Sequence, residues 1–170
     1  MLFTVLFWVF FLSMVSRVED FVEAYFILKN YLVLRNVPFR PRKGWKDIDV
    51  LALNDKKLYI VECKRGAVAS PSKIIEHLFS AEKFLRTTSP YREIIEKLGL
   101  VIKKMYVAEY IRKEKEAIKN AGIEVKNVSE IVREIVKIVG ENVSKKKIEG
   151  AYPNPLIRYT VLLYKTKHLR

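Results

Sequence analysis

The chain has few of the residues that form disulfides and cysteine- or histidine-based metal clusters. Its 170 residues include one cysteine, Cys63, and two histidines, His77 and His168, which lie far apart in the sequence. One cysteine excludes an internal disulfide and a cysteine-based zinc cluster, and the spacing of the histidines does not suggest a metal pair. Glutamine is absent, whereas Lys, Glu, Ile and Val are abundant. This bias is reported for hyperthermophile proteins, and it hints at the source rather than at the function.

The sequence also contains no glycine-rich phosphate loop, no internal repeat and no low-complexity tract. With 50% apolar and 30% charged residues it has the composition of a globular protein. A length of 170 residues is enough for one domain with a real hydrophobic core. Disorder is therefore not expected.

Acidic residues are in deficit. The 32 Lys and Arg residues against 19 Asp and Glu residues give a formal net charge of +13. Neutralisation of phosphates by Lys and Arg supplies most of the non-specific affinity of proteins for nucleic acids. An acidic polymer is therefore the expected partner, and the alternative is a soluble basic protein without such a partner.

Residues 1–15 carry no charged side chain. A membrane-spanning helix needs about 20 apolar residues, and a secretory signal normally begins with a basic region that is missing here. One interpretation is that translation begins at Met14, because residues 16–19 (Ser-Arg-Val-Glu) form a capping box that would start a helix. That start predicts a cytoplasmic protein. The alternatives are a membrane anchor formed by residues 1–15, present only if the natural protein keeps them, or a buried segment.

Hydrophobic periodicity and turn residues predict alternating strands and helices. The apolar runs at 47–54 and 58–64 are joined by a short turn, which favours a hairpin with both faces covered. The pattern predicts an α/β fold with a mixed central sheet flanked by helices. Residues 16–142 are expected to form this domain, and residues 143–170 a basic helical extension. The expected elements are helices at 16–29, 73–86, 91–98, 110–121, from the cap Ser129 onward and at 155–164, further strands at 31–34, 100–108 and 123–128, and a loop or ragged edge strand at 35–46.

Charged residues interrupt the two apolar strands of this hairpin. Asp49 precedes the run Val-Leu-Ala-Leu of the first strand, and Glu62 and Lys64 end the second. Because side chains alternate along a strand, Glu62 and Lys64 project to one face while Cys63 points to the other. Burial of an ionised group costs several kcal/mol unless it is paired or bound to a metal. These positions therefore call for a functional explanation.

The order of these residues resembles that of the PD-(D/E)XK nuclease superfamily. Glu19 lies on the first helix, Asp49 on one strand, and Glu62-Cys63-Lys64 on the next. The resemblance covers about residues 16–86, and its spacing is similar to that of Holliday-junction-resolvase-like and archaeal restriction-endonuclease-like members. One departure is Ile48, which stands where the superfamily motif often has proline. The resemblance implies a restriction endonuclease-like fold with Glu19, Asp49, Glu62 and Lys64 as catalytic residues.

Phosphodiester hydrolysis requires charge neutralisation on the phosphate and an activated water, which divalent ions can provide. Magnesium prefers oxygen ligands, which suits Asp49, Glu62 and the backbone carbonyl of Cys63, and Mn²⁺ is an alternative ion. Lys64 would orient the attacking water or stabilise developing negative charge, without a definite role as a base. Glu19 would ligate a second ion or hold a water.

Each of these residues also has a structural explanation. Glu62 and Lys64 would form an ordinary ion pair on an edge strand, and Asp47 competes with Asp49 because it lies two residues earlier on the same face. Glu19 stands where a capping box that begins at Ser16 requires a glutamate. Further alternatives are Glu23, one turn later, as a substitute for Glu19, and Cys63 as a small core residue rather than a reactive thiol.

Basic residues surround the predicted site in sequence and are expected to bind nucleic acid. Trp45 and Phe39 would stack on an unpaired base. Either ring could instead fill the core, and this alternative is favoured for Phe39. Lys73, His77 and Lys83 on the following helix would face the phosphate if the N-terminal end of that helix abuts the site. The predicted nucleic-acid-binding residues are Arg35, Arg40, Arg42, Lys43, Lys46 and Arg65.

The sequence thus predicts a magnesium-dependent DNA endonuclease, either structure-specific and junction-resolvase-like or restriction-like. DNA is the expected partner, and a homodimer with C2 symmetry would match a twofold substrate. Two other functions remain open. One is a protein with the nuclease fold that binds DNA without cutting it, and the other is a basic domain held against anionic lipid by residues 1–15.

Overall fold

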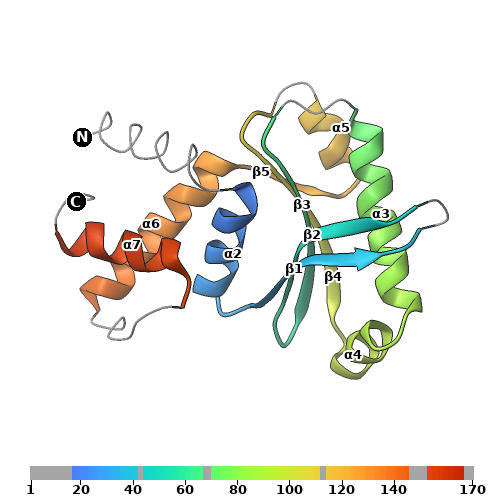
Figure 1. Ribbon diagram of the computed structural model, residues 1–170, viewed down its shortest axis with the longest axis horizontal. Helices are drawn as coiled ribbons and strands as arrows, with labels where there is room; N and C mark the ends of the chain where they lie inside the picture. Colours follow the sequence, from blue (N-terminus) through green and yellow to red (C-terminus); the bar gives the residue numbers. More distant parts are fainter. Residues whose placement is uncertain (1–16, 42–43, 67–69, 112–113, 146–152, 167–170) are drawn as a thin grey trace.

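The apolar runs of the sequence form one mixed sheet of five strands in the order β1-β2-β3-β4-β5 (Figure 1). The computed structural model describes residues 17–41, 44–66, 70–111, 114–145 and 153–166. Strands β1 to β3 pair antiparallel, and β4 and β5 are added in parallel. The strands are β1 (Leu32–Phe39), β2 (Lys46–Leu53), β3 (Lys57–Lys64), β4 (Val101–Ala108) and β5 (Glu124–Asn127).

The predicted β2–β3 hairpin is confirmed. Its turn is closed by Asn54, whose side-chain oxygen accepts hydrogen bonds from the backbone N–H groups of Lys56 (3.0 Å) and Lys57 (2.8 Å). Asparagine favours turns because its side chain can satisfy backbone donors in this way. The register pairs Leu53 with Leu58 and Val50 with Val61.

Strand β1 is longer than the four residues predicted for it. It continues through Arg35 and Pro38 to Phe39, which confirms for residues 35–39 the edge strand that was predicted as the alternative to a loop. Proline is tolerated there because an edge strand has one side without ladder hydrogen bonds. Asn36 has a positive φ of 50° and lies between two paired positions of the strand, Arg35 and Val37.

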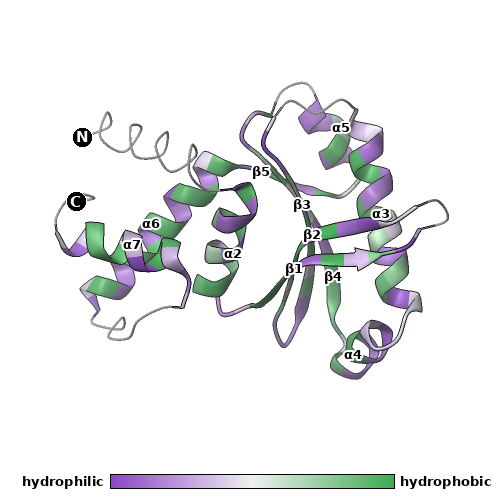
Figure 2. Ribbon diagram, viewed as in Figure 1, coloured by the Kyte–Doolittle hydropathy of each residue, from purple (hydrophilic) through white to green (hydrophobic). Residues whose placement is uncertain are grey.

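Helices cover both faces of the sheet, as the continuous apolar strands predicted. Figure 1 shows α2, α6 and α7 on one side and α3, α4 and α5 on the other. Each layer contains both apolar and polar residues (Figure 2), which is typical of helices with one face on a core. The helices are α2 (Val18–Leu28), α3 (Pro71–Thr87), α4 (Tyr91–Leu98), α5 (Glu114–Asn120), α6 (Val128–Ser144) and α7 (Pro155–Lys165). Within the described ranges, no helix has the length and apolarity needed to cross a membrane, and the predicted segment 1–15 lies outside those ranges.

Two buried clusters form the core, one on each face. On the first, Val61 and Cys63 pack with residues of α2 and α6, and Ile157 of α7 is buried in the same cluster. On the second, Ile60 packs with Leu78 of α3. Helix α7, which lies in the predicted C-terminal extension, contributes to the first cluster, and α6 spans residue 142.

Two helix starts differ from the sequence prediction. Helix α6 is capped by Asn127 rather than by Ser129, because the Asn127 side chain accepts the Ser129 N–H at 2.8 Å. Helix α2 is preceded by the cap residue Arg17, whose N–H donates to Asp20 at 2.7 Å. Asp20, not Glu19, therefore occupies the capping position. The prediction that Glu19 completes a capping box beginning at Ser16 is therefore wrong.

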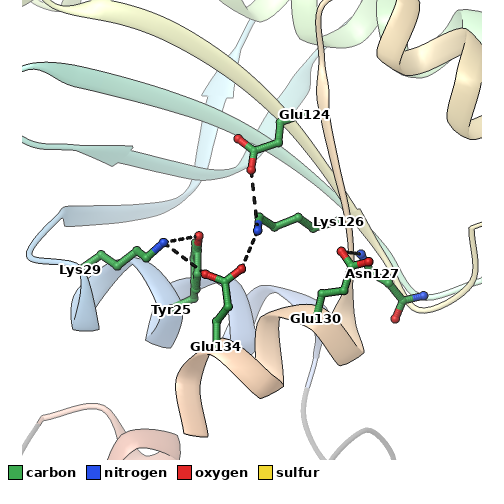
Figure 3. A network of polar contacts seen from close by, with 7 residues as sticks. All are labelled: Tyr25, Lys29, Glu124, Lys126, Asn127, Glu130 and Glu134. Carbon is green, nitrogen blue, oxygen red and sulfur yellow. Dashed lines mark hydrogen bonds and ion pairs between the residues drawn. The ribbon is translucent and has the colours of Figure 1, made fainter. Parts of the chain in front are cut away.

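A polar network ties the helical layer of α2 and α6 to strand β5 (Figure 3). Lys126 lies 2.6 Å from Glu134 and 3.8 Å from Glu124, measured between charged atoms. Lys29 bridges Glu134 (3.3 Å) and the hydroxyl of Tyr25 (2.6 Å). Burial, with the nearby carboxylates, raises the pKa of Tyr25 to about 12, so its hydroxyl stays protonated. The charges in this network neutralise one another.

Lys126→Met is expected to lower the free energy of unfolding by about 1–3 kcal/mol, because it leaves partly buried carboxylates without their cation. Urea denaturation measures this change. Lys137→Met, which alters an exposed lysine of α6, is the control and should change stability by no more than about 0.5 kcal/mol. Equal effects of the two substitutions would show that the network contributes nothing.

Candidate active site

The acidic residues meet where the β2–β3 ladder ends. The backbone pairing of β2 with β3 ends at Val50 and Val61. Beyond this pair, the Cys63 N–H donates to the side chain of Asp49, at 2.7 Å from Oδ2. This hydrogen bond holds the Asp49 carboxylate against the strand that carries Glu62. Asp47 is exposed, so the structure places Asp49 rather than Asp47 beside β3.

The Asp49 carboxylate lies in an electrostatically unfavourable place. Burial, followed by repulsion from Glu62, raises the pKa of Asp49 to about 6. The hydrogen bond from Cys63 and the positive charge of Lys64 lower the pKa of Asp49, but by less than burial and Glu62 raise it. Two carboxylates that repel each other at the same end of a sheet form an anionic centre that favours a cation.

Glu62 is 6% exposed and has a basic group near each oxygen. Its Oε1 lies 2.6 Å from Lys64 Nζ, and its Oε2 lies 3.1 Å from His77 Nε2. Burial alone would lower the pKa of Lys64, but the hydrogen bond and attraction of Glu62 and the charge of Asp49 outweigh it, so the net shift is upward. Lys64 is therefore a stable cation at neutral pH.

His77 reaches this centre from α3. Its ring lies 5.4 Å from that of Phe39, between centroids, and it makes a hydrogen bond with the backbone of Asp47. Burial, together with the charge of Lys46, lowers the pKa of His77, so the imidazole is neutral at neutral pH. The contact with Glu62 is close, but it lacks the direction of a hydrogen bond, since Nε2 is buried without a hydrogen-bond partner.

Glu19 lies close enough to raise the pKa of both Asp49 and Cys63 through its charge, although it is not the first cause of either shift. Glu23, the substitute for Glu19, is engaged elsewhere, because its Oε2 lies 3.3 Å from Arg35. Burial raises the pKa of the Cys63 thiol well above its usual value, which fits the expectation of an inert core residue.

The carboxylates of Asp49 and Glu62 offer oxygen atoms, which are the ligands that Mg²⁺ prefers. Among the described residues, no three His, Cys, Asp or Glu side chains are grouped so as to hold an ion. Magnesium requires only one or two carboxylates, and waters and substrate phosphate complete its octahedral shell. Asp49 and Glu62, with the Cys63 carbonyl, fit this requirement. Coordination by Glu62 would compete with its ion pair to Lys64.

The predicted nucleic-acid-binding residues fall into different environments. Arg35 donates to Asp20 at 2.6 Å, so its charge is already neutralised. Arg65 is exposed and lies 3.8 Å from Glu109. Arg40 and Lys46 lie at the β1–β2 end of the sheet, near α3. Arg42 and Lys43 lie outside the described residues.

The sequence did not predict that His77 lies beside Glu62. It placed His77 on a helix that could face the phosphate but did not give the packing of that helix on the sheet. Phe39 is 1% exposed, so the prediction that it fills the core is confirmed, whereas Trp45 is exposed.

A mixed sheet flanked by helices, with an acid on β2 and a Glu-x-Lys motif on β3, is consistent with a restriction endonuclease-like α/β fold. The model of NERD, the nuclease-related domain, matches residues 16–123. The chain belongs to this family, which is part of the PD-(D/E)XK-like nuclease superfamily, and the resemblance noted in the sequence is confirmed. Family membership supports a nuclease.

Among solved structures, the crystal structure of "protein of unknown function AF1548" is similar to this chain with a TM-score of 0.44 and 15% identity. The match covers 89% of this chain and 97% of that one. A search of the curated proteins finds no match.

Proposed function

We propose that this protein is a metal-dependent endonuclease that hydrolyses phosphodiester bonds of DNA. The observation that carries the proposal is the hydrogen bond from Cys63 to Asp49, which joins Asp49 to the Glu62-Cys63-Lys64 strand. The raised pKa of Asp49 adds support, because strongly shifted groups in a cluster of charges are typical of functional sites. The family match supports the nuclease part of the proposal.

In the proposed site Asp49, Glu62 and the Cys63 carbonyl hold a divalent cation, Mg²⁺ or alternatively Mn²⁺. The cation, when bound, would supply charge neutralisation at the phosphate and a more acidic water. Lys64 places a positive charge next to the carboxylates, where it can attract the phosphate and stabilise developing negative charge. Glu19 approaches from α2 and can orient a water. His77 limits the freedom of Glu62 through its contact at 3.1 Å.

Cleavage should depend on the divalent cation. The purified full-length chain is incubated with plasmid, branched and single-stranded DNA in Mg²⁺, in Mn²⁺ or in EDTA, and products are separated on gels. We expect cutting with either metal and none with EDTA. Asp49→Asn protein, purified in parallel, detects a contaminating nuclease. Cleavage that persists in EDTA, or equal cleavage by both proteins, would contradict the proposal.

A further inference from the structure

A groove of about 740 Å³ lies between the β1–β2 end of the sheet and helix α3. Its size falls in the range of small-ligand sites, which is about 300–1,000 Å³. Seven of its nine lining residues are polar or charged, and Pro41 and Phe84 contribute apolar surface. The lining residues are Arg40, Pro41, Lys46, Glu76, Ser80, Lys83, Phe84, Thr87 and Thr88.

The cations of this groove differ from three lysines of the sheet. Lys64, Lys104 and Lys126 all make ion pairs with carboxylates. In contrast, no ion pair joins Arg40, Lys46 or Lys83 to an acid within the described part of the chain. Glu76 is the acidic residue of the lining. Three cations against one carboxylate make the groove a site for an anion.

The groove adjoins the acidic centre. Glu76 lines the groove, and the next residue of α3, His77, lies 3.1 Å from Glu62. On the apolar side, the Phe84 ring lies 5.6 Å from Phe39, and Phe39 lies 5.4 Å from His77, between centroids. A phosphodiester chain that leaves the acidic centre along α3 would therefore enter the groove.

A large aromatic side chain stands exposed beside it. Trp45 is 71% exposed, and the Arg40 guanidinium lies 5.8 Å from the centroid of its ring. An exposed tryptophan next to a basic groove is the combination by which proteins hold single-stranded nucleic acid, because bases stack on the ring while cations follow the backbone. A paired base in a duplex has its faces covered by its neighbours and cannot stack in this way.

We propose that this groove binds an unpaired stretch of DNA next to the scissile bond, with Trp45 as the stacking surface and Arg40, Lys46 and Lys83 as the phosphate contacts. The proposal rests on the proposed function, because it extends the substrate path away from the Asp49–Glu62 centre. It assigns the substrate class as DNA with a single-stranded segment, such as a flap or a branched end, rather than as continuous duplex.

Binding can be tested without cleavage. Fluorescence anisotropy in EDTA compares fluorescein-labelled single-stranded and duplex oligonucleotides of roughly 20 nucleotides over a series of salt concentrations. We expect tighter binding of the single strand. Lys83→Ala should weaken that binding and reduce the slope of log K against log salt by about 0.7, the value for one phosphate contact on a single strand. Lys137→Ala removes a lysine that is also exposed, on α6 across the sheet, and should leave the slope unchanged. Equal slopes for the two variants would overturn the proposal.

Trp45→Ala tests stacking. It should weaken single-strand binding by about fivefold or more, while duplex binding changes little. In a Trp8→Phe background Trp45 is the remaining tryptophan, and its fluorescence should be quenched by single-stranded DNA. Circular dichroism and a thermal melt establish that each variant is folded. Equal losses for single strand and duplex, or no quenching, would overturn the stacking assignment.

The two proposals fail in different ways. If the protein binds single-stranded DNA through the groove but never cuts in Mg²⁺ or Mn²⁺, the inference about the groove stands and the endonuclease proposal fails. If it cuts with metal but Lys83→Ala and Trp45→Ala bind and cut like the parent, the groove assignment fails and the endonuclease proposal stands.

Discussion

Asp49→Asn is expected to abolish DNA cleavage and, at the same time, to stabilise the metal-free protein. The amide keeps the shape of the carboxylate, and its oxygen can still accept the Cys63 N–H that Asp49 accepts at 2.7 Å. It removes the negative charge that metal binding requires. Loss of a group that stabilises charge in a transition state typically costs about 10²–10³-fold in rate. We expect at least that loss here.

The gain in stability follows from the raised pKa of Asp49, about 6 in the folded protein. Below the unfolded pKa of about 4 the group is protonated in both states. Between about pH 4 and 6 the folded state binds more protons than the unfolded state, so stability falls as pH rises, and the loss is complete above pH 6. Asp49→Asn removes this loss, which is about 1–3 kcal/mol for a shift of this size.

Thermal unfolding in EDTA from pH 4 to 8 measures this effect. The parent should lose stability across this window relative to Asp49→Asn, and each kcal/mol corresponds to about 2–4 °C in Tm for a chain of this length. Asp47→Asn, which alters the exposed neighbour, is the matched control and should follow the parent. A variant that is inactive but no more stable above pH 6 would contradict the electrostatic account of Asp49.

Local signals in the sequence were sufficient for most of the fold. The hairpin at residues 47–64 and the helix at 91–98 were predicted from hydrophobic periodicity and turn residues, and the structure confirms them. The errors lie at element ends. Asn127 caps α6 two residues before the predicted Ser129. The strand predicted at 31–34 extends to Phe39, because its pairing with β2 continues to that residue.

The candidate site was harder to predict, because it depends on contacts between distant parts of the chain. The pattern of the strands, together with the resemblance to the superfamily, selected Asp49 and Glu62. It did not show that α3 brings His77 to Glu62, or that Arg35 is neutralised by Asp20. Both contacts result from the way helices pack on the sheet. The groove likewise joins β1 and β2 to α3, so charge runs in the sequence could indicate a basic surface but not its shape.

Lys64→Met is expected to lower the cleavage rate by about 10²–10³-fold, because it removes the positive charge that the proposed site directs at the phosphate. Lys64 Nζ lies 2.6 Å from Glu62, and the upward shift of its pKa keeps it protonated at neutral pH. A charged lysine can stabilise negative charge but cannot accept a proton. Lys64→Arg keeps the charge and should therefore retain more activity than Lys64→Met.

The pH dependence of cleavage separates the two roles of Lys64. If Lys64 acts through its charge, deprotonation of this lysine should not raise the cleavage rate of the parent at saturating metal between about pH 7 and 9. The ordinary pKa of lysine, about 10.4, lies above this range. If Lys64 acts as a base, the rate should climb with pH over this range, and Lys64→Arg should be as inactive as Lys64→Met, because arginine stays protonated. Single-turnover rates of the parent and both variants, measured at saturating Mg²⁺ across this range, distinguish these outcomes. A lysine paired with Glu62 in the folded protein favours the role of a fixed charge.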